Sequence, residues 1–165
     1  MPRRVVVVLA VVALLGCGPA ARGGSSGGGQ SGGAAAAIDL TFSGEISGHA
    51  TQLAKKGDCT TDPKYAVQFH LYGFTLYPVV GGKTYKLGLS IGNFPGPGTL
   101  PGNKVLLVVE DEQAKKGWYT TDASTGTFVV NPDVISGSID IPDIAYASYP
   151  KTKVGVKGTY RCPPT

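Results

Sequence analysis

The sequence predicts an all-β domain, either an antiparallel β-sandwich or a barrel-like sheet, of about eight strands. Several short segments alternate apolar and polar residues with the period of two that a half-buried strand shows. Turn-forming Gly and Pro residues separate these segments, in a chain of 165 residues that holds 25 Gly and 12 Pro. No window shows a convincing 3.6-residue apolar period, which argues against a helical bundle.

The expected strands are short apolar or alternating segments between turn signals. They are residues 38–42, 67–71, 85–91, 105–109, 128–130, 135–141 and 154–160. Residues 105–109 are apolar without interruption, and we therefore expect a central strand that is buried on both faces. The turn signals are Gly81-Gly82, Pro95-Gly96-Pro97-Gly98, Pro101-Gly102 and Asn131-Pro132-Asp133.

The chain begins with the features of a secretory signal. Arg3 and Arg4 precede an apolar run from Val5 to Leu15. As a helix this run would span about 16 Å, which is too short for a bilayer core of about 30 Å. It is therefore expected to be the apolar region of a signal peptide rather than a permanent membrane helix.

The run ends in Leu14-Leu15-Gly16-Cys17, which resembles the lipobox of bacterial lipoproteins. The resemblance implies that residues 1–16 are a lipoprotein signal peptide and that Cys17 is the lipidated mature N-terminus. Two acyl chains suffice for stable membrane attachment. The protein would then be exported and lipid-anchored to the cell membrane or outer membrane, with its domain facing the periplasm or the exterior. The alternative is an ordinary cleaved signal with an incidental cysteine.

A tether is expected to follow the anchor. Seventeen of the twenty residues from Gly18 to Ala37 are Gly, Ala or Ser. Such a composition cannot bury enough apolar surface to offset the entropy lost on ordering, and as a flexible coil it would reach about 25 Å. We therefore divide the chain into a signal at residues 1–16, a lipidated cysteine and tether at residues 17–37, and a β domain at residues 38–165.

Charge excludes one class of partner. Without Arg3 and Arg4, 13 basic residues stand against 11 acidic ones, and only 16% of the whole chain is charged. We expect no nucleic-acid partner, because no basic patch remains to neutralise phosphates.

Two cysteines remain in the domain, Cys59 and Cys162. An even pair in an exported protein predicts a disulfide. Cys162 shares strand parity with Val154, Val156 and Tyr160, and we expect it to face the interior with them.

The sequence contains two catalytic motifs in unsuitable contexts. Gly88-Leu89-Ser90-Ile91-Gly92 matches a nucleophile elbow but lies inside a strand pattern, and both His49 and His70 precede the serine. Ser148-Tyr149-Pro150-Lys151 matches S-x-x-K, but the proline opposes the helix that this motif needs. We therefore expect no catalytic residues.

We also expect no metal site and no cofactor. His49 and His70 lack the close spacing of zinc ligands, and His70 is expected on a solvated strand face. Glu110-Asp111-Glu112 lacks the pattern of a calcium loop and is expected to be a solvated strand end. No phosphate loop or dinucleotide fingerprint is present.

A nine-residue segment occurs twice. Residues 54–62 and 114–122 are identical at seven of nine positions and share the letters AKKG and TTD. The simpler interpretation is a shared hairpin, with a type I turn through the lysines and Gly at positive φ as a bulge. The alternative is two cationic tips that bind an anion.

Aromatic residues are the remaining candidates for recognition. Exposed Tyr and Trp side chains can stack on sugars or anchor a protein partner, whereas buried ones pack the core. The candidate ligand-binding residues are Trp118, Tyr119, Tyr72 and Tyr77.

Two edges of the domain, Gly44–Gly48 and Val154–Cys162, loosely resemble exported bacterial lipoprotein domains of unknown function, and this resemblance implies no activity. We expect an envelope lipoprotein with a non-catalytic binding or structural domain, whose partners are the membrane, through its lipid, and an envelope protein or glycan. The alternatives are a carbohydrate- or cell-wall-binding module that uses surface aromatics, and an envelope hydrolase.

Overall fold

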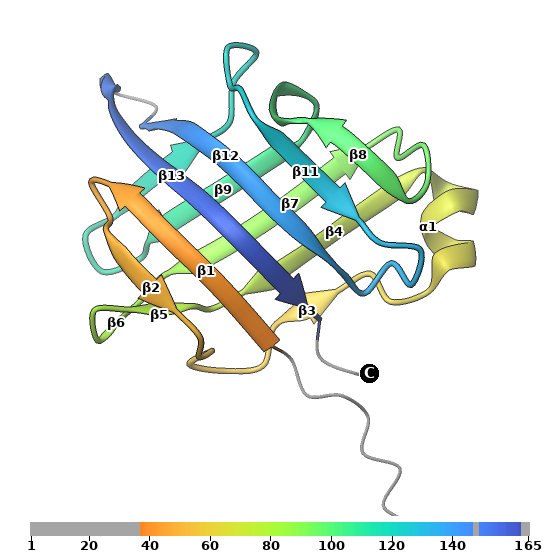
Figure 1. Ribbon diagram of the computed structural model, residues 1–165, viewed down its shortest axis with the longest axis horizontal. Coiled ribbons are helices and arrows are strands. Elements are labelled where there is room, and N and C mark those ends of the chain that lie inside the picture. Colours follow the sequence, from red (N-terminus) through yellow and green to blue (C-terminus); the bar gives the residue numbers. More distant parts are fainter. Residues whose placement is uncertain (1–36, 147–148, 163–165) are drawn as a thin grey trace, which may run out of the picture. The chain divides into compact units, whose positions relative to one another are not determined.

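One antiparallel sheet curls into a half-barrel in the computed structural model, which describes residues 37–146 and 149–162 (Figure 1). The strands are β1 (Ala37–Gly44), β2 (Gly48–Ala50), β3 (Asp58–Cys59), β4 (Leu71–Leu76), β5 (Val79–Val80), β6 (Lys83–Thr84), β7 (Lys86–Gly92), β8 (Gly98–Pro101), β9 (Leu106–Asp111), β10 (Lys116–Tyr119), β11 (Thr127–Val130), β12 (Ser136–Tyr146) and β13 (Tyr149–Arg161). The helices are α1 (Pro63–Phe69) and the 3₁₀ turn η1 (Gly102–Lys104). No helix within the described ranges is long and apolar enough to cross a bilayer.

The sheet runs in the order β2-β1-β13-β12-β10-β9-β7-β4-β3, and β11 and β8 extend it beside β12. β5 and β6 form a separate hairpin across Gly81 and Gly82. The expected all-β antiparallel class is confirmed, in its barrel-like form. The described residues hold more than eight strands because β2, β3, β5 and β6 have only two or three residues, too few to show an alternation.

β12 carries the sheet from one layer to the other. Its first half pairs with β11 and its last two residues pair with β10, while β13 follows it on the other side. The register shifts between Ile141 and Ile144, at a bulge that contains Pro142. A bulge bends a strand and increases its twist, and a proline there costs no ladder hydrogen bond. In Figure 1, β1, β13, β12, β11 and β8 consequently lie in front of β4, β7 and β9.

The core fills the space between the two layers, and the expected alternation supplies much of it. Ile38, Leu40 and Phe42 of β1 point inward and are buried. Leu87, Leu89 and Ile91 do the same from β7, while Tyr85 before β7 is partly buried.

The expectation that residues 105–109 are buried on both faces is wrong. Val105, Leu107 and Val109 are buried, but Leu106 between them is 50% exposed. β9 is covered by the opposite layer on one face only, and its other face is open. Because Leu106 on that open face is apolar, the sequence does not show the alternation of buried and exposed residues along this strand.

The expected strand at residues 67–71 is also wrong, because most of this segment belongs to α1. Asp62 caps the helix by accepting a hydrogen bond from the Lys64 N–H at 2.8 Å, and Pro63 occupies its first turn. His70 ends the helix in the left-handed region at φ 52°, and β4 begins at the next residue. An Asp-Pro pair is a helix start signal. It outweighs the apparent alternation of Val67 with Phe69, which lie exposed on the helix.

The two nine-residue repeats are not two equivalent hairpins. The second copy does form a hairpin, between β9 and β10, but Lys115 rather than Gly117 adopts positive φ. The first copy forms no hairpin, and its Gly57 is buried where an added Cβ would overlap the Thr75 carbonyl oxygen.

The two copies share a structure at their C-terminal end. There Thr60 in the first copy and Thr120 in the second each form two hydrogen bonds to a residue of the neighbouring strand. The Thr60 N–H donates to the Gly73 carbonyl at 2.8 Å and its hydroxyl oxygen accepts from the Gly73 N–H at 3.2 Å. Thr120 makes the same two bonds with Leu107, at 3.0 and 2.9 Å. The shared TTD letters therefore mark two similar strand ends.

A disulfide joins Cys59 to Cys162, as expected, with the two Cα atoms 6.0 Å apart. Cys162 is buried, as its strand parity predicts. The bond ties the edge strand β3 to the residue that follows β13, and so closes one open side of the half-barrel. The predicted signal, Cys17 and most of the tether lie outside the described residues.

Candidate functional site

Two of the four aromatic candidates belong to the core. Trp118 is 2% exposed, and its indole Nε1–H donates to a Glu45 carboxylate oxygen at 3.3 Å. Tyr72 is also 2% exposed and shares a hydrogen bond of 3.0 Å with the Tyr160 hydroxyl. Its ring stacks on Phe94, with centroids 5.0 Å apart. The proposal that these two side chains contact a ligand is therefore wrong, because both are enclosed by packing.

The other two candidates are partly buried and lie far apart in the sheet. Tyr77 follows β4, and the Lys55 ammonium lies 3.8 Å from its ring centroid, within range of a cation–π contact. Tyr119 lies on β10 and covers Gly117, where an added Cβ would lie 2.5 Å from the tyrosine oxygen. β7 and β9 separate the strands, so the fold does not bring the two rings together.

The exposed large apolar residues lie elsewhere. Within the described part of the chain these side chains, all close to half exposed, are Tyr65, Val67, Phe69, Leu71 and Leu106. Four of them come from α1 and the first residue of β4, and the fifth lies on β9. Contiguous exposed apolar surface often marks an interaction site. The exposed positions on α1 were missed from the sequence because residues 67–71 were placed in a strand.

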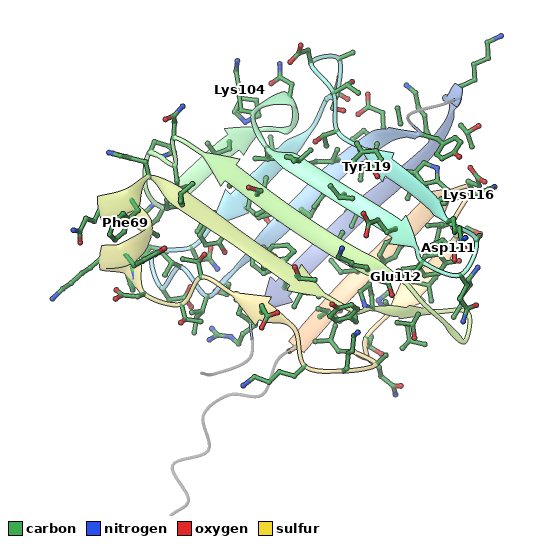
Figure 2. The ribbon with its side chains drawn as sticks, turned by 180° about the vertical axis from the view of Figure 1, so that it is seen from behind. Phe69, Lys104, Asp111, Glu112, Lys116 and Tyr119 are labelled. Carbon is green, nitrogen blue, oxygen red and sulfur yellow. A yellow bond between two sulfur atoms is a disulfide. The ribbon has the colours of Figure 1, made fainter. Side chains whose placement is uncertain are left out.

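We call the middle of the outer surface of β4, β7 and β9 the glycine face and define it by eight residues that point away from the core: Leu71, Gly73, Thr75, Gly88, Ser90, Gly92, Leu106 and Val108. Lys86 and Glu110 point the same way and lie at its border, where they also line the central groove described below. Figure 2 views the molecule from this side, with Phe69 on α1 at one border and Tyr119 and Lys116 at the opposite border. Three of the eight residues are glycines, so the middle of this face is shallow.

Three depressions cross the glycine face. The α1 groove, of about 470 Å³, is lined at its polar side by Asp58, Thr60, Thr61, Asp62 and Thr75, with Tyr65 and Gly73. The central groove, of about 190 Å³, lies over Gly88 and shares Thr75 with the α1 groove. A third, of about 550 Å³, shares Ser90 and Leu106 with the central groove and ends at Asp122. These shared residues make the depressions one continuous surface.

Ion pairs occupy the border of the glycine face near β10. The Lys86 ammonium lies 2.8 Å from the Glu110 carboxylate, and Lys83 pairs with Asp111. Burial raises the pKa of Asp111, but hydrogen bonds from Lys83 and from the Ala114 N–H outweigh burial and leave this pKa below its usual value. Asp111 is only 5% exposed, so the expected solvated strand end is wrong at this residue. These charges stabilise the β9–β10 turn.

The described residues do not assemble a catalytic or metal-binding cluster. Ser90 is exposed in the middle of β7 and pairs in register with Gly73, three residues, or about 10 Å of strand, from His70. His49 lies on β2 and its ring Nε2 is 2.7 Å from an Asp39 carboxylate oxygen. His70 is exposed, but at the end of α1 rather than on the expected strand face. No group of three His, Cys, Asp or Glu side chains among residues 37–146 and 149–162 could hold a metal ion.

Ser148 of the S-x-x-K motif lies outside the described residues, while Lys151 is in β13 rather than in a helix. In comparisons of the chain with protein-family models, curated proteins and solved structures, none matched. We therefore infer the function from the surface of the domain and from the sequence.

Proposed function

We propose that this protein is a lipid-anchored binding protein of the bacterial cell envelope whose domain binds its ligand on the glycine face and catalyses no reaction. The lipobox-like segment ending at Cys17 and the Gly, Ala and Ser-rich tether that follows support the anchored part of the proposal. The glycine face supports the binding part.

Gly88 is the observation that carries the binding surface. Glycine inside a strand costs about 0.5–1 kcal/mol relative to alanine, and it often marks a place where a ligand or another backbone comes close. Gly88 does not have positive φ, and an added Cβ would meet only the Val108 Cβ, at the ordinary contact distance of 3.9 Å. Neither its backbone nor its packing requires glycine. A ligand that lies flat on the sheet would require it.

The neighbouring glycines sharpen this comparison. At Gly73 an added Cβ would come within 2.7 Å of the Leu89 carbonyl oxygen, so packing alone explains that glycine. At Gly92 an added Cβ would meet nothing within 4 Å. The fold therefore explains neither Gly88 nor Gly92. Both lie on the outer face of β7, with Ser90 between them.

The outer surface of the opposite layer has a different character. Lys157 pairs with Asp140 at 2.8 Å, and His49 pairs with Asp39, all on exposed side chains. None of the exposed large apolar residues of the described part lies on β1, β12 or β13. Charged pairs of this kind keep a surface solvated, whereas a shallow surface with exposed apolar residues favours contact with a ligand.

Binding can be tested with the chain from residue 18 onward, which keeps every described residue. We expect this chain to co-sediment with washed envelopes of the source bacterium, and Gly88→Val to weaken that binding by about tenfold or more by filling the central groove. Thr159→Val, which places a valine side chain on the exposed face of the opposite layer, is the control for an added apolar surface residue. Lack of binding by the wild type, or equal binding by Gly88→Val, would overturn the binding surface.

The anchor has a separate test. Cys17→Ala in the full chain should abolish the mass increase of a diacylglyceryl group and move the protein from the detergent phase to the aqueous phase. Ser25→Ala, a change of similar size in the tether, should leave both unchanged. Membrane retention of the Cys17→Ala protein would contradict the anchor.

A further inference from the structure

The exposed aromatic pair on α1 has no role in the core. Tyr65 and Phe69 lie one helical turn apart, with ring centroids 4.6 Å apart and planes tilted by 42°. They are 49% and 52% exposed, and Ala66 is the buried residue of this helix. Only Tyr65 of the two lines the α1 groove. Its ring therefore forms an apolar wall beside a polar floor.

The polar floor carries unused hydrogen-bonding groups. Within the described residues, the Thr61 and Thr75 hydroxyls and the Asp58 carboxylate have no hydrogen-bond or ion-pair partner. Asp62 uses one carboxylate oxygen to cap α1 and keeps the other. Hydroxyl donors and carboxylate acceptors within one groove suit a ligand that carries many hydroxyl groups.

The walls of the groove are held in place. Cys59 lines it and is bonded to Cys162, and Thr60 makes two hydrogen bonds with Gly73 on the neighbouring strand. Gly73 leaves the floor without a side chain. A preformed groove of about 470 Å³ falls in the range of about 300–1,000 Å³ that small ligands occupy.

The charge of the groove selects among hydroxyl-rich ligands. Its lining includes the carboxylates of Asp58 and Asp62 and no Lys, Arg or His. Carboxylates repel phosphates, sulfates and uronic acids, and they accept hydrogen bonds from neutral hydroxyls. Aromatic rings pack against the apolar face of a sugar ring while the sugar hydroxyls remain free to bond elsewhere.

We propose that the α1 groove binds a neutral saccharide, with Tyr65 stacking on the sugar ring and Asp58, Thr61 and Thr75 bonding its hydroxyls. This assignment rests on the proposed binding function and names its ligand class. The saccharide extends from the α1 groove over Gly88, because the central groove continues from Thr75.

Calorimetric titration of the chain from residue 18 tests the ligand class. The probes are chitotetraose and cellotetraose as neutral oligosaccharides and tetragalacturonic acid as an acidic one. We expect at least one neutral probe to bind, and the acidic probe to bind at least about tenfold more weakly. Absence of neutral binding at millimolar concentration, or equal binding of the acidic probe, would overturn the proposal.

Variants on α1 and β3 test the site. Tyr65→Ala and Asp58→Asn should each weaken neutral binding by about tenfold, and Tyr65→Phe should preserve it because stacking needs only the ring. Val67→Ala is the matched control, since Val67 is 47% exposed on the same helix and does not line the groove. All three side chains are exposed, so unfolding should not confuse the result. Equal effects of Tyr65→Ala and Val67→Ala would refute the stacking role.

Envelope binding separates this proposal from the one on which it rests. We expect the neutral oligosaccharide that binds in the calorimetric titration to displace the protein from envelopes, and protease-treated envelopes to keep the protein. If Gly88→Val abolishes envelope binding but neither the neutral oligosaccharides nor Tyr65→Ala reduce it, the glycine face stands and the saccharide is wrong. Loss of binding after protease treatment alone would indicate a protein partner and would likewise overturn the saccharide.

Discussion

Replacing both Cys59 and Cys162 by alanine removes the link between the two layers. The bond closes a loop with a sequence separation of 103 residues. In the chain-entropy model, a loop of this length confers about 4.7 kcal/mol at 25 °C by restricting the unfolded chain. The whole free energy of unfolding of a domain is about 5–15 kcal/mol, so the variant should be marginally stable.

The local geometry predicts which part of the domain opens first when this stabilisation is lost. β3 pairs with β4 through only two residues, Asp58 opposite Thr75 and Cys59 opposite Phe74. Without the bond, little holds this edge strand, whereas β7 lies between two neighbours in the middle of the sheet. Amide protons of β3 and the α1 groove should therefore exchange early, and those of β7 should keep most of their protection.

Urea unfolding with linear extrapolation measures the total loss. We expect a decrease of about 4–5 kcal/mol for the double alanine variant. Reduced wild-type protein is the matched control, because it keeps both sulfur atoms and lacks only the bond. A decrease of less than about 1 kcal/mol in both proteins would show that the unfolded chain is already compact enough to make the link redundant, and would refute the reasoning.

Three further changes test other parts of the fold. Burial, above all, raises the pKa of Tyr72 to about 12 and also raises that of Tyr160, so the neutral phenols favour the folded state. The free energy of unfolding should therefore be constant up to about pH 10 and fall by roughly 1.4 kcal/mol per pH unit per tyrosine above it. Phenolate absorbance and urea unfolding measure this dependence. A free energy of unfolding that stays constant from about pH 10 to about pH 12 would contradict it. Glu45→Gln should cost less than about 1 kcal/mol by weakening the pair with Lys116, whereas Glu45→Ala should cost about 1–3 kcal/mol by leaving the buried indole N–H of Trp118 without its acceptor. Equal costs in thermal unfolding would remove that role. Gly158→Ala should lose about 2 kcal/mol or more, because Gly158 has φ +141° and a Cβ there would overlap the Asp39 carbonyl oxygen; wild-type stability in urea would show that β13 can shift.

The strands that could be predicted are those whose two faces differ. At residues 38–42 and 85–91 one face meets the core and the other meets water or charged neighbours, so the period of two is visible in the letters. At residues 105–109 both faces are apolar although only one is buried, so the same rule failed. At residues 63–69 a local cap from Asp62 and Pro63 decided the structure, while the apolar spacing suggested a strand.

The sequence did not show which aromatic side chains are exposed. Trp118 and Tyr72 were expected to bind a ligand but are buried, whereas Tyr65, which lines the proposed groove, is exposed. Which aromatic faces solvent depends on the strands and helices that cover it, and these come from distant parts of the chain. The glycines at 73, 88 and 92 could be counted in the sequence. That they lie on one face became visible only with the pairing of β4 and β7.

The sequence by itself determined the all-β class, the alternation in its regular strands, and the inward parity of Cys162, because each follows from how a few consecutive residues meet core and solvent. The tertiary structure alone decided that the repeated TTD segments end two different strands and that Gly88 lies bare beside Thr75, Leu106 and Val108. The physical reason is that local patterns depend on the geometry of a short piece of backbone. A shared surface depends on the register of strands far apart in the chain, which packing of the whole sheet selects.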